Sequence, residues 1–286
     1  MSGAIELKGI GKNYGSVKAL EDVTLTFMPS TIYGLLGRNG AGKTTLLNII
    51  ADRVFKDTGE LIFSGEQQGA FSERSGIFMV SESSLYPEAM RVRDVFRWTK
   101  EFYPSFDLEK AGRLSERFAL NTKSKVKALS TGYGSILKNI VALCLDVPYI
   151  LLDEPVLGLD ANHRELFYRL LIEKYNEKPA TYIISTHIIE EIQNIIERVV
   201  IIDKGRIIKD ESCADLMGMG YTITGAKGAV DEYVKGRDVI GQRQIGGIKT
   251  AYIMGNAPDA APQWLEIGRP DLQTLFIQLT GETEVD

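Results

Sequence analysis

The sequence predicts an α/β protein with a mostly parallel core sheet, followed by a small C-terminal α+β appendage. Three observations predict this fold class. A glycine-rich turn joins a strand-like apolar segment to a helix-like apolar segment within 32–51. Short apolar runs then alternate with helical patterns, which is typical of a parallel sheet covered by helices. Near residue 217 the alternation stops, so we expect a main domain over 1–217 and an appendage over 218–286.

The main domain should contain short strands separated by helices. The run Tyr-Ile-Leu-Leu at 149–152 is continuously apolar, as expected for a parallel strand buried on both faces. Val92, Val95 and Phe96 recur at helical spacing until Pro104 breaks the run. The same patterns predict strands at 4–7, 24–27, 32–36, 59–63, 77–80, 149–152, 181–185 and 199–202, and helices at 43–51, within 88–127 (one of them at 106–120), 130–145, 162–175 and 188–196. In the appendage they predict strands at 221–224, 238–242 and 248–254 and a helix at 271–279.

Composition and charge narrow the classes of function. The 286 residues are 44% hydrophobic and 25% charged, which is ordinary for a globular protein, and a net charge of -5 argues against a nucleic-acid partner. The two cysteines, Cys144 and Cys213, are too few for a disulfide framework or a zinc site and favour a reducing, cytosolic compartment. We find no signal-peptide pattern and no apolar run of about 20 residues, so a membrane role would require a partner.

The glycine-rich turn carries the first chemical motif. Its sequence GRNGAGKT at 37–44 matches the phosphate-binding pattern G-x-x-x-x-G-K-[ST], and it lies between an expected strand and an expected helix. Backbone N–H groups of such a turn and the start of the helix can surround phosphate oxygens. Lys43 should reach the β- and γ-phosphates and Thr44 should bind Mg²⁺. The motif alone indicates a nucleoside triphosphate and does not choose among kinases, GTPases and motor ATPases.

Two carboxylates follow the apolar strand at 149–152. Asp153 suits the organisation of Mg²⁺, and Glu154 is placed to polarise an attacking water as a general base. The alternative is that these acids cap a helix, because acidic residues often follow strands for that reason.

Further motifs in a fixed order identify a family resemblance. The sequence LSTGY lies at 129–133, DEPVLGLD at 153–160, and Ser-Thr-His at 185–187 closes the next strand. Together with the phosphate loop, these motifs resemble those of the ABC (ATP-binding cassette) ATPase family over about 4–217. The resemblance implies a P-loop NTPase cassette with an antiparallel β subdomain and a helical subdomain at about 88–145.

The resemblance also implies roles within one nucleotide site. Tyr14 corresponds to an aromatic residue that stacks on adenine, although a partly buried surface tyrosine would have the same sequence pattern. Asp153 corresponds to the metal-organising acid, Glu154 to the catalytic base and His187 to the histidine beside the γ-phosphate. The implied phosphate-loop contacts are Gly37, Asn39, Gly40, Ala41, Gly42, Lys43, Thr44 and Thr45.

A second group of residues implies a dimer. Ser130 and Gly132 resemble the signature residues that contact the γ-phosphate bound by the opposite subunit, and the same serine is also an ordinary helix N-cap. Asp160 resembles an aspartate that communicates across the dimer interface. Two cassettes, identical or different, would therefore enclose two ATP molecules.

The sequence departs from the family at two places. Aligned on Leu85-Tyr86-Pro87, Ser81 stands where the family usually has a glutamine that senses Mg²⁺, so either Glu82 replaces it as a metal-side residue or the coupling contact differs. Thr131 and Tyr133 replace a common glycine and a common glutamine of the signature. We hypothesise slower or partner-dependent hydrolysis.

The expected function is the ATP-hydrolysing motor of a membrane transporter. The cofactors would be ATP and Mg²⁺, the partner a separate membrane-spanning subunit, and the location the cytoplasmic face of the cell membrane. The segment 270–281 resembles a C-terminal helix of bacterial exporter-type cassettes, although any amphipathic docking helix has the same pattern. The alternatives are a soluble ABC ATPase acting on ribosomes or nucleic acid, and a nucleotide-sensing regulatory module.

Overall fold

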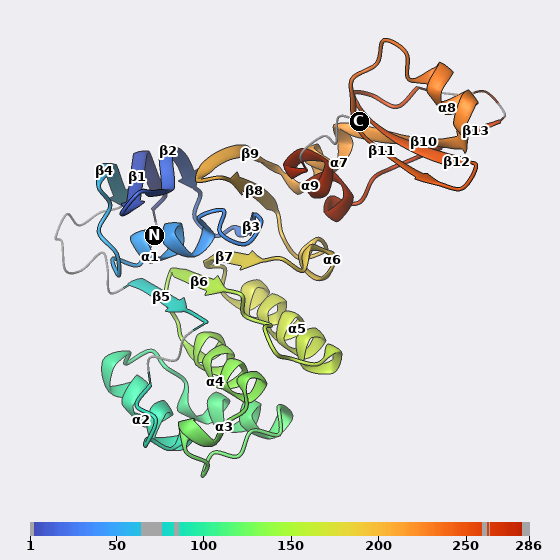
Figure 1. Cartoon of the computed structure of the whole chain (residues 1–286). Coiled ribbons are helices and arrows are strands. Elements are labelled where there is room, and N and C mark those ends of the chain that lie inside the picture. The colour runs from blue at the N-terminus through green and yellow to red at the C-terminus, as the bar shows by residue number, and fades with distance from the viewer. Residues whose placement is uncertain (1–2, 64–75, 83–85, 259–261, 263, 282–286) are drawn as a thin grey trace.

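A six-stranded sheet forms the centre of the molecule (Figure 1). The computed structural model describes residues 3–63, 76–82, 86–258, 262 and 264–281. In spatial order the strands are β5 (Ile77–Val80), β6 (Tyr149–Asp153), β7 (Thr181–Thr186), β3 (Ile32–Leu36), β8 (Arg198–Asp203) and β9 (Arg206–Ser212). The first five strands are parallel and β9 is antiparallel to β8. The predicted α/β class with a mostly parallel sheet is confirmed.

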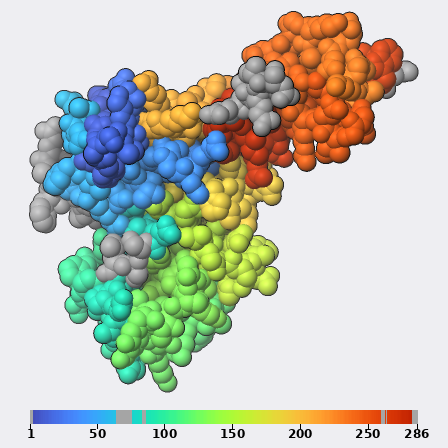
Figure 2. All heavy atoms as spheres, in the orientation of Figure 1, coloured from blue at the N-terminus to red at the C-terminus, as the bar shows by residue number. Residues whose placement is uncertain are grey.

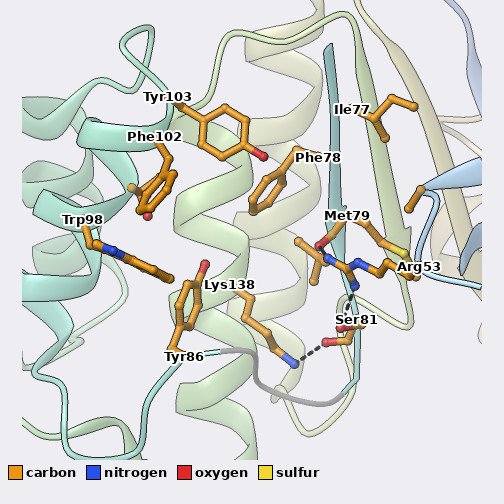
Figure 3. A pocket seen from close by; sticks show the side chains of 13 residues that line it. Arg53, Ile77, Phe78, Met79, Ser81, Tyr86, Trp98, Phe102, Tyr103 and Lys138 are labelled. Carbon is orange, nitrogen blue, oxygen red and sulfur yellow. Dashed lines mark hydrogen bonds between the residues drawn. The ribbon is translucent and has the colours of Figure 1, made fainter. Parts of the chain in front are cut away.

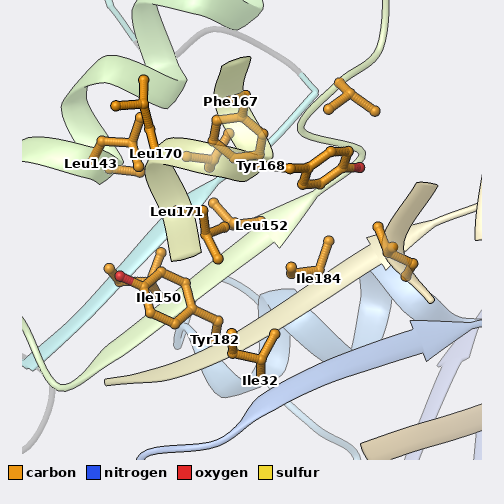
Figure 4. Packing of buried hydrophobic residues seen from close by; sticks show 14 of the residues in the cluster. Ile32, Leu143, Ile150, Leu152, Phe167, Tyr168, Leu170, Leu171, Tyr182 and Ile184 are labelled. Atoms are coloured by element: carbon orange, nitrogen blue, oxygen red, sulfur yellow. The ribbon is translucent and has the colours of Figure 1, made fainter. Parts of the chain in front are cut away.

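Alternate residues of the sheet enter two different cores. Ile150 and Leu152 of β6 pack with α4 (Thr131–Cys144) and α5 (Ala161–Glu177), and Figure 4 shows the α5 side chains lying over them. Leu151 belongs instead to the core that contains α1 (Lys43–Ile50). Apolar residues on both faces explain why the central strands are continuous apolar runs in the sequence.

An antiparallel sheet covers the second core. Its strands run in the order β2 (Val17–Phe27), β1 (Ile5–Tyr14) and β4 (Thr58–Phe63). β1 and β2 form a hairpin much longer than the expected strands 4–7 and 24–27. Cross-strand pairing extends the ladder through 8–14 and 17–23, where the residues are largely polar, glycine or exposed and carry no simple alternation of burial.

The helical subdomain lies at the β5 end of the sheet (Figure 1). It consists of α2 (Val92–Phe102), α3 (Leu108–Arg117), the 3₁₀ turn η2 (Val126–Ala128) and the start of α4. α3 is shorter than the expected helix 106–120. It begins later because Asp107 caps it by accepting the N–H of Lys110 at 2.8 Å, and it ends before Ala119, whose φ is +52°. The expected helix 188–196 is also too long, since α6 spans only Ile189–Ile192 before the chain turns towards β8.

The appendage is a second antiparallel sheet that protrudes from one side of the molecule (Figure 2). Its strands, in spatial order, are β11 (Val239–Ile245), β12 (Ile248–Met254), β10 (Gly220–Ala226) and β13 (Leu265–Gly268). Four elements in and before it were not expected from the sequence: β9, α7 (Cys213–Gly218), α8 (Lys227–Tyr233) and β13. Residues 282–286 of the expected appendage lie outside the described residues.

The last helix returns from the appendage to the main core. Leu272 and Leu275 of α9 (Leu272–Thr280) are fully buried in the same cluster as Ile189 and Ile192 of α6. The appendage sheet has its own smaller core around Ile223 and other buried residues. Within the described part of the chain, no helix has the length and apolar character needed to cross a bilayer.

Candidate nucleotide site

The phosphate loop occupies the tight turn between β3 and α1. Gly40 and Gly42 have φ values of +80° and +112°, a region that glycine enters without steric cost. At Gly37 a Cβ atom would lie 2.5 Å from the carbonyl oxygen of Ile202, so a larger residue does not fit there. Asn39 and Gly40 are exposed at the outer edge of the loop, whereas Ala41, Gly42 and Lys43 are buried. The sequence therefore forms a compact turn whose outer edge is accessible.

Lys43 lies inside the loop to which it belongs. Its Nζ donates to the carbonyl oxygens of Gly37 at 2.6 Å and Arg38 at 3.2 Å. Burial lowers the pKa of Lys43, while the carboxylates of Glu154 and Asp153 act in the opposite direction. The ammonium group thus lies within electrostatic reach of both acids, and phosphate oxygens could replace its two carbonyl acceptors. Thr44, beside it, is exposed and Thr45 is partly buried.

The adjacent ends of β6 and β7 bring the acids and the histidine together. Asp153 is buried and accepts a hydrogen bond from the hydroxyl of Ser185 on β7. Glu154 Oε2 lies 2.9 Å from His187 Nδ1. The Glu154 backbone has a φ of +47° and its N–H donates to the Ser185 carbonyl at 3.0 Å, which fixes the direction of the side chain. Such a pair can orient a water molecule and accept its proton.

Ser130 and Asp160 both act as helix caps. The Ser130 hydroxyl accepts the N–H of Tyr133 at 3.3 Å at the start of α4. Asp160 accepts the N–H of His163 at 2.9 Å at the start of α5, and this bond is the main reason why the pKa of Asp160 is lowered. Both residues are exposed, so capping leaves them accessible from outside. A Cβ atom on Gly132 would lie 2.4 Å from the Gly158 carbonyl oxygen, so the signature turn packs directly on the turn before α5.

A small pocket lies between the signature turn and Glu154. Its volume is about 270 Å³, and Ser130, Thr131, Glu82, Lys138 and Glu154 are among the residues that line it. Of the described residues, those of the phosphate loop are absent from this lining. Within one chain, the signature residues therefore share a pocket with Glu154 and Glu82, and the phosphate loop does not line that pocket.

Tyr14 and Ser81 lie at the margins of the site. Tyr14 ends β1 with its ring half exposed and Lys12 Nζ 5.5 Å from the ring centroid. Ser81 follows β5, and its hydroxyl accepts a hydrogen bond from Arg53 at 3.3 Å. Leu85, used to align Ser81 with the family, lies outside the described residues.

A larger groove opens between the helical subdomain and the sheet (Figure 3). Its volume is about 560 Å³. Aromatic side chains from α2 and the segments around it form one wall, whereas Arg53, Ser81 and Lys138 form the floor near the nucleotide site. The aromatic lining residues are Phe78, Tyr86, Trp98, Phe102 and Tyr103.

From the sequence, Ser185 is recognised only as part of the motif at 185–187 and has no role of its own, and Arg53 and Lys138 are not singled out. Ser185 bonds Asp153 across 32 positions of the chain, a contact that no local spacing reveals. Lys138 does leave a signal, because it is a single cation within the otherwise apolar and neutral stretch 135–144 of α4. Arg53 follows α1 as an ordinary surface residue would, and its sequence context carries no such signal.

The fold and the site together define a P-loop nucleotide-binding cassette. The family model described as ABC transporter matches residues 20–157. The chain is 30% identical over 217 residues to the ABC transporter ATP-binding protein YtrB of Bacillus subtilis, covering 75% of this chain and 72% of YtrB. It is 32% identical to the ABC transporter ATP-binding protein NatA of the same organism, covering 67% of this chain and 81% of NatA.

One relative and one solved structure extend the comparison. The linearmycin resistance ATP-binding protein LnrL of Bacillus subtilis is 26% identical, with 98% of this chain and 99% of LnrL covered, so the similarity includes the appendage. A dimeric ATP-binding cassette solved in a post-hydrolysis state with ADP and Pi has a TM-score of 0.63 at 22% identity, covering 73% of this chain and 98% of that one.

The chain belongs to the ABC transporter ATP-binding proteins. It is an ATP-binding and ATP-hydrolysing subunit of that family, as the motifs predicted. Subunits of this kind work with membrane subunits and dimerise.

Proposed function

We propose that Glu154 is the general base of ATP hydrolysis in this cassette and that His187 orients it. The observation that carries the proposal is the 2.9 Å contact between Glu154 Oε2 and His187 Nδ1, at the carboxyl ends of two adjacent parallel strands. Glu154 would accept a proton from the attacking water while Lys43 moves from its loop carbonyls to the β- and γ-phosphate oxygens. The charge that develops on the phosphate is then next to a buried cation.

The donor set fits Mg²⁺. Among the described residues, no group of three or more His, Cys, Asp or Glu side chains is arranged to hold a metal ion. Mg²⁺ characteristically takes one or two protein oxygen ligands and completes its shell with phosphates and water. The exposed Thr44 hydroxyl and the buried Asp153 carboxylate, beside the phosphate loop, would be those ligands. The bound ion would neutralise phosphate charge, and Glu82 is the further metal-side residue of this proposal.

We propose further that two cassettes, either two copies or this chain with a similar one, close on two ATP molecules. Ser130 and Gly132 start α4 with the exposed N-terminal end that a phosphate would contact. The phosphate loop of the same chain does not line the signature pocket, which favours contact with the nucleotide of the second cassette. Asp160, exposed at the start of α5, would face the same interface. The domain division at 217/218 is part of this proposal, with the appendage as an accessory unit.

The 560 Å³ groove is the proposed docking site of a membrane-spanning subunit at the cytoplasmic face of the membrane. The occupant would be a short helix of that subunit, because the aromatic wall supplies apolar contact area. Ser81 and Lys138 belong to the groove floor, and Lys138 also lines the pocket that contains Glu82, so an occupant would touch residues next to the proposed metal side of the site. The proposal is supported by the family relationship and by the position of the groove next to the metal side of the site.

The test of the hydrolytic assignment is Glu154→Gln. This change keeps the size of the side chain and a contact with His187 but removes the base, so we expect ATP binding to be retained and turnover to fall by roughly 100-fold or more. Binding of a fluorescent ATP analogue and release of inorganic phosphate measure the two effects. Hydrolysis at the wild-type rate would exclude Glu154 as the base.

A further inference from the structure

Lys138 crosses from the signature helix to the end of β5. Its Nζ donates to the carbonyl oxygens of Ser81 and Glu82, each at 2.7 Å. The side chain lines the 560 Å³ groove on one side and the 270 Å³ pocket that contains Glu154 on the other. Figure 3 shows it reaching from α4 towards Ser81.

Burial and neighbouring carboxylates act in opposite directions on the charge of Lys138. Burial lowers the pKa of Lys138, and the carboxylates of Glu82 and Asp153 favour its charged form. From the opposite side, Arg53 donates to the Met79 carbonyl at 3.0 Å and to the Ser81 hydroxyl at 3.3 Å. Arg53, which follows α1, and Lys138 of α4 therefore both bond the chain at the end of β5, between residues 79 and 82.

We propose that Lys138 is a positioning residue that fastens segment 81–82 to the signature helix α4 and so sets the place of the Glu82 carboxylate relative to the metal side of the nucleotide site. The inference deepens the proposed function and rests on it, since that function gives Glu82 its metal-side role. Backbone carbonyls are the acceptors, so the link holds the chain itself and is independent of the side chains at 81 and 82. An occupant of the groove would press on this link and move α4 and segment 81–82 together.

A matched control is a lysine that bonds the C-terminal end of the same helix α4 from the neighbouring helix α5. Lys174 of α5 is also partly buried, and its Nζ donates to the carbonyl oxygens of Ala142, at 2.8 Å, and Leu145. It lies beside Asp146 and Cys144, away from the nucleotide residues. Lys138→Met and Lys174→Met both remove a partly buried ammonium bonded to two carbonyls, but only the first releases segment 81–82.

The first measurement is the mobility of a nitroxide spin label attached to Glu82→Cys in the full chain. Both native cysteines are buried and burial raises the pKa of Cys144 to about 12, so the introduced thiol can be labelled selectively. We expect the label to become more mobile with Lys138→Met and to stay unchanged with Lys174→Met. An unchanged spectrum with Lys138→Met would overturn the inference.

The second measurement is the Mg²⁺ dependence of ATP hydrolysis with Glu82 intact. We expect Lys138→Met to raise the half-saturating Mg²⁺ concentration roughly tenfold, as the loss of residues that support ligands commonly does. Lys138→Arg, which can still donate to both carbonyls, should restore it, and Lys174→Met should leave it unchanged. Increased mobility with an unaltered Mg²⁺ requirement would contradict the positioning role, whereas failure of the hydrolytic proposal itself would be detected separately with Glu154→Gln.

Discussion

Single residues in this site are held by their neighbours in conformations that they would not adopt alone. Glu154 has left-handed backbone geometry at a φ of +47°, which costs a non-glycine residue on the order of 1 kcal/mol. Its N–H bond to the Ser185 carbonyl of β7 compensates for that cost. The backbone of the proposed base is therefore fixed before any nucleotide binds, and only the side chain needs to adjust.

Gly132 is the position in the signature turn where the packing leaves no room for a side chain. A Cβ atom there would lie 2.4 Å from the Gly158 carbonyl oxygen, whereas one on Gly134 would meet nothing within 4 Å. We expect Gly132→Ala to displace the start of α4, to destabilise the protein by about 1–3 kcal/mol and to reduce ATPase activity at least tenfold, since roughly 1 Å of misplacement is costly in an active site. Urea unfolding and phosphate release measure both effects.

Gly134→Ala is the control for helix propensity in the same turn. Because its methyl group would meet nothing within 4 Å, it should raise the unfolding free energy by up to about 1 kcal/mol and affect activity far less than Gly132→Ala does. Equal behaviour of the two variants would show that the contact with Gly158 is unimportant.

At the scale of elements, α2 and the end of β5 make the groove. Phe102 is 65% exposed on α2 although it lies in a wall of aromatic residues, and Trp98 is 39% exposed. Apolar side chains left open in a concave surface are a common feature of sites that a partner covers. This wall lines the same groove as Ser81 and Lys138, so the groove borders the nucleotide site.

Phe102→Ala tests the groove as a docking site. We expect recovery of a membrane-spanning subunit on the purified, tagged protein to fall, with affinity weakened roughly tenfold by the loss of an aromatic contact. Phe55→Ala is the control, because Phe55 is 83% exposed and is absent from the groove lining. Quantitative mass spectrometry of gently solubilised membranes compares the two variants. Equal recovery with both would remove Phe102 from the interface.

The sequence predicted elements well where a local pattern decides them. The phosphate turn and the apolar strand 149–152 belong to this class, because glycine spacing and continuous apolarity act over few residues. β9 was missed because its residues are mostly polar and it forms only by pairing with β8 through a turn in which Lys204 and Gly205 both have positive φ. The groove was also hidden, since it is made by segments distant in sequence. The roles of individual site residues remain predictions.

At the scale of the molecule, α9 ties the appendage to the cassette. Its buried residues Leu272 and Leu275 share a core with α6, the short helix that follows His187 directly. A change in the appendage could therefore reach the histidine through packed side chains, without a flexible linker between them.

Leu275→Ala tests that connection. Leu275 is 1% exposed, and we expect its truncation to cost about 2–5 kcal/mol of unfolding free energy in the main core, measured by urea denaturation. The matched variant Ile277→Ala, at a position 51% exposed on the same helix, should change it by less than about 1 kcal/mol. A similar small loss for both variants would mean that α9 contributes little to the cassette.

The return of α9 has a consequence for biosynthesis. Every other contributor to the main core is translated before residues 272–280, so a chain emerging from the ribosome exposes the apolar side of α6 while the whole appendage sheet is still being made. Ile189 and Ile192 then complete their packing only when α9 has been synthesised. The cassette thereby acquires its final packing late, and a nascent chain that stalls within the appendage would remain a target for chaperones and proteases.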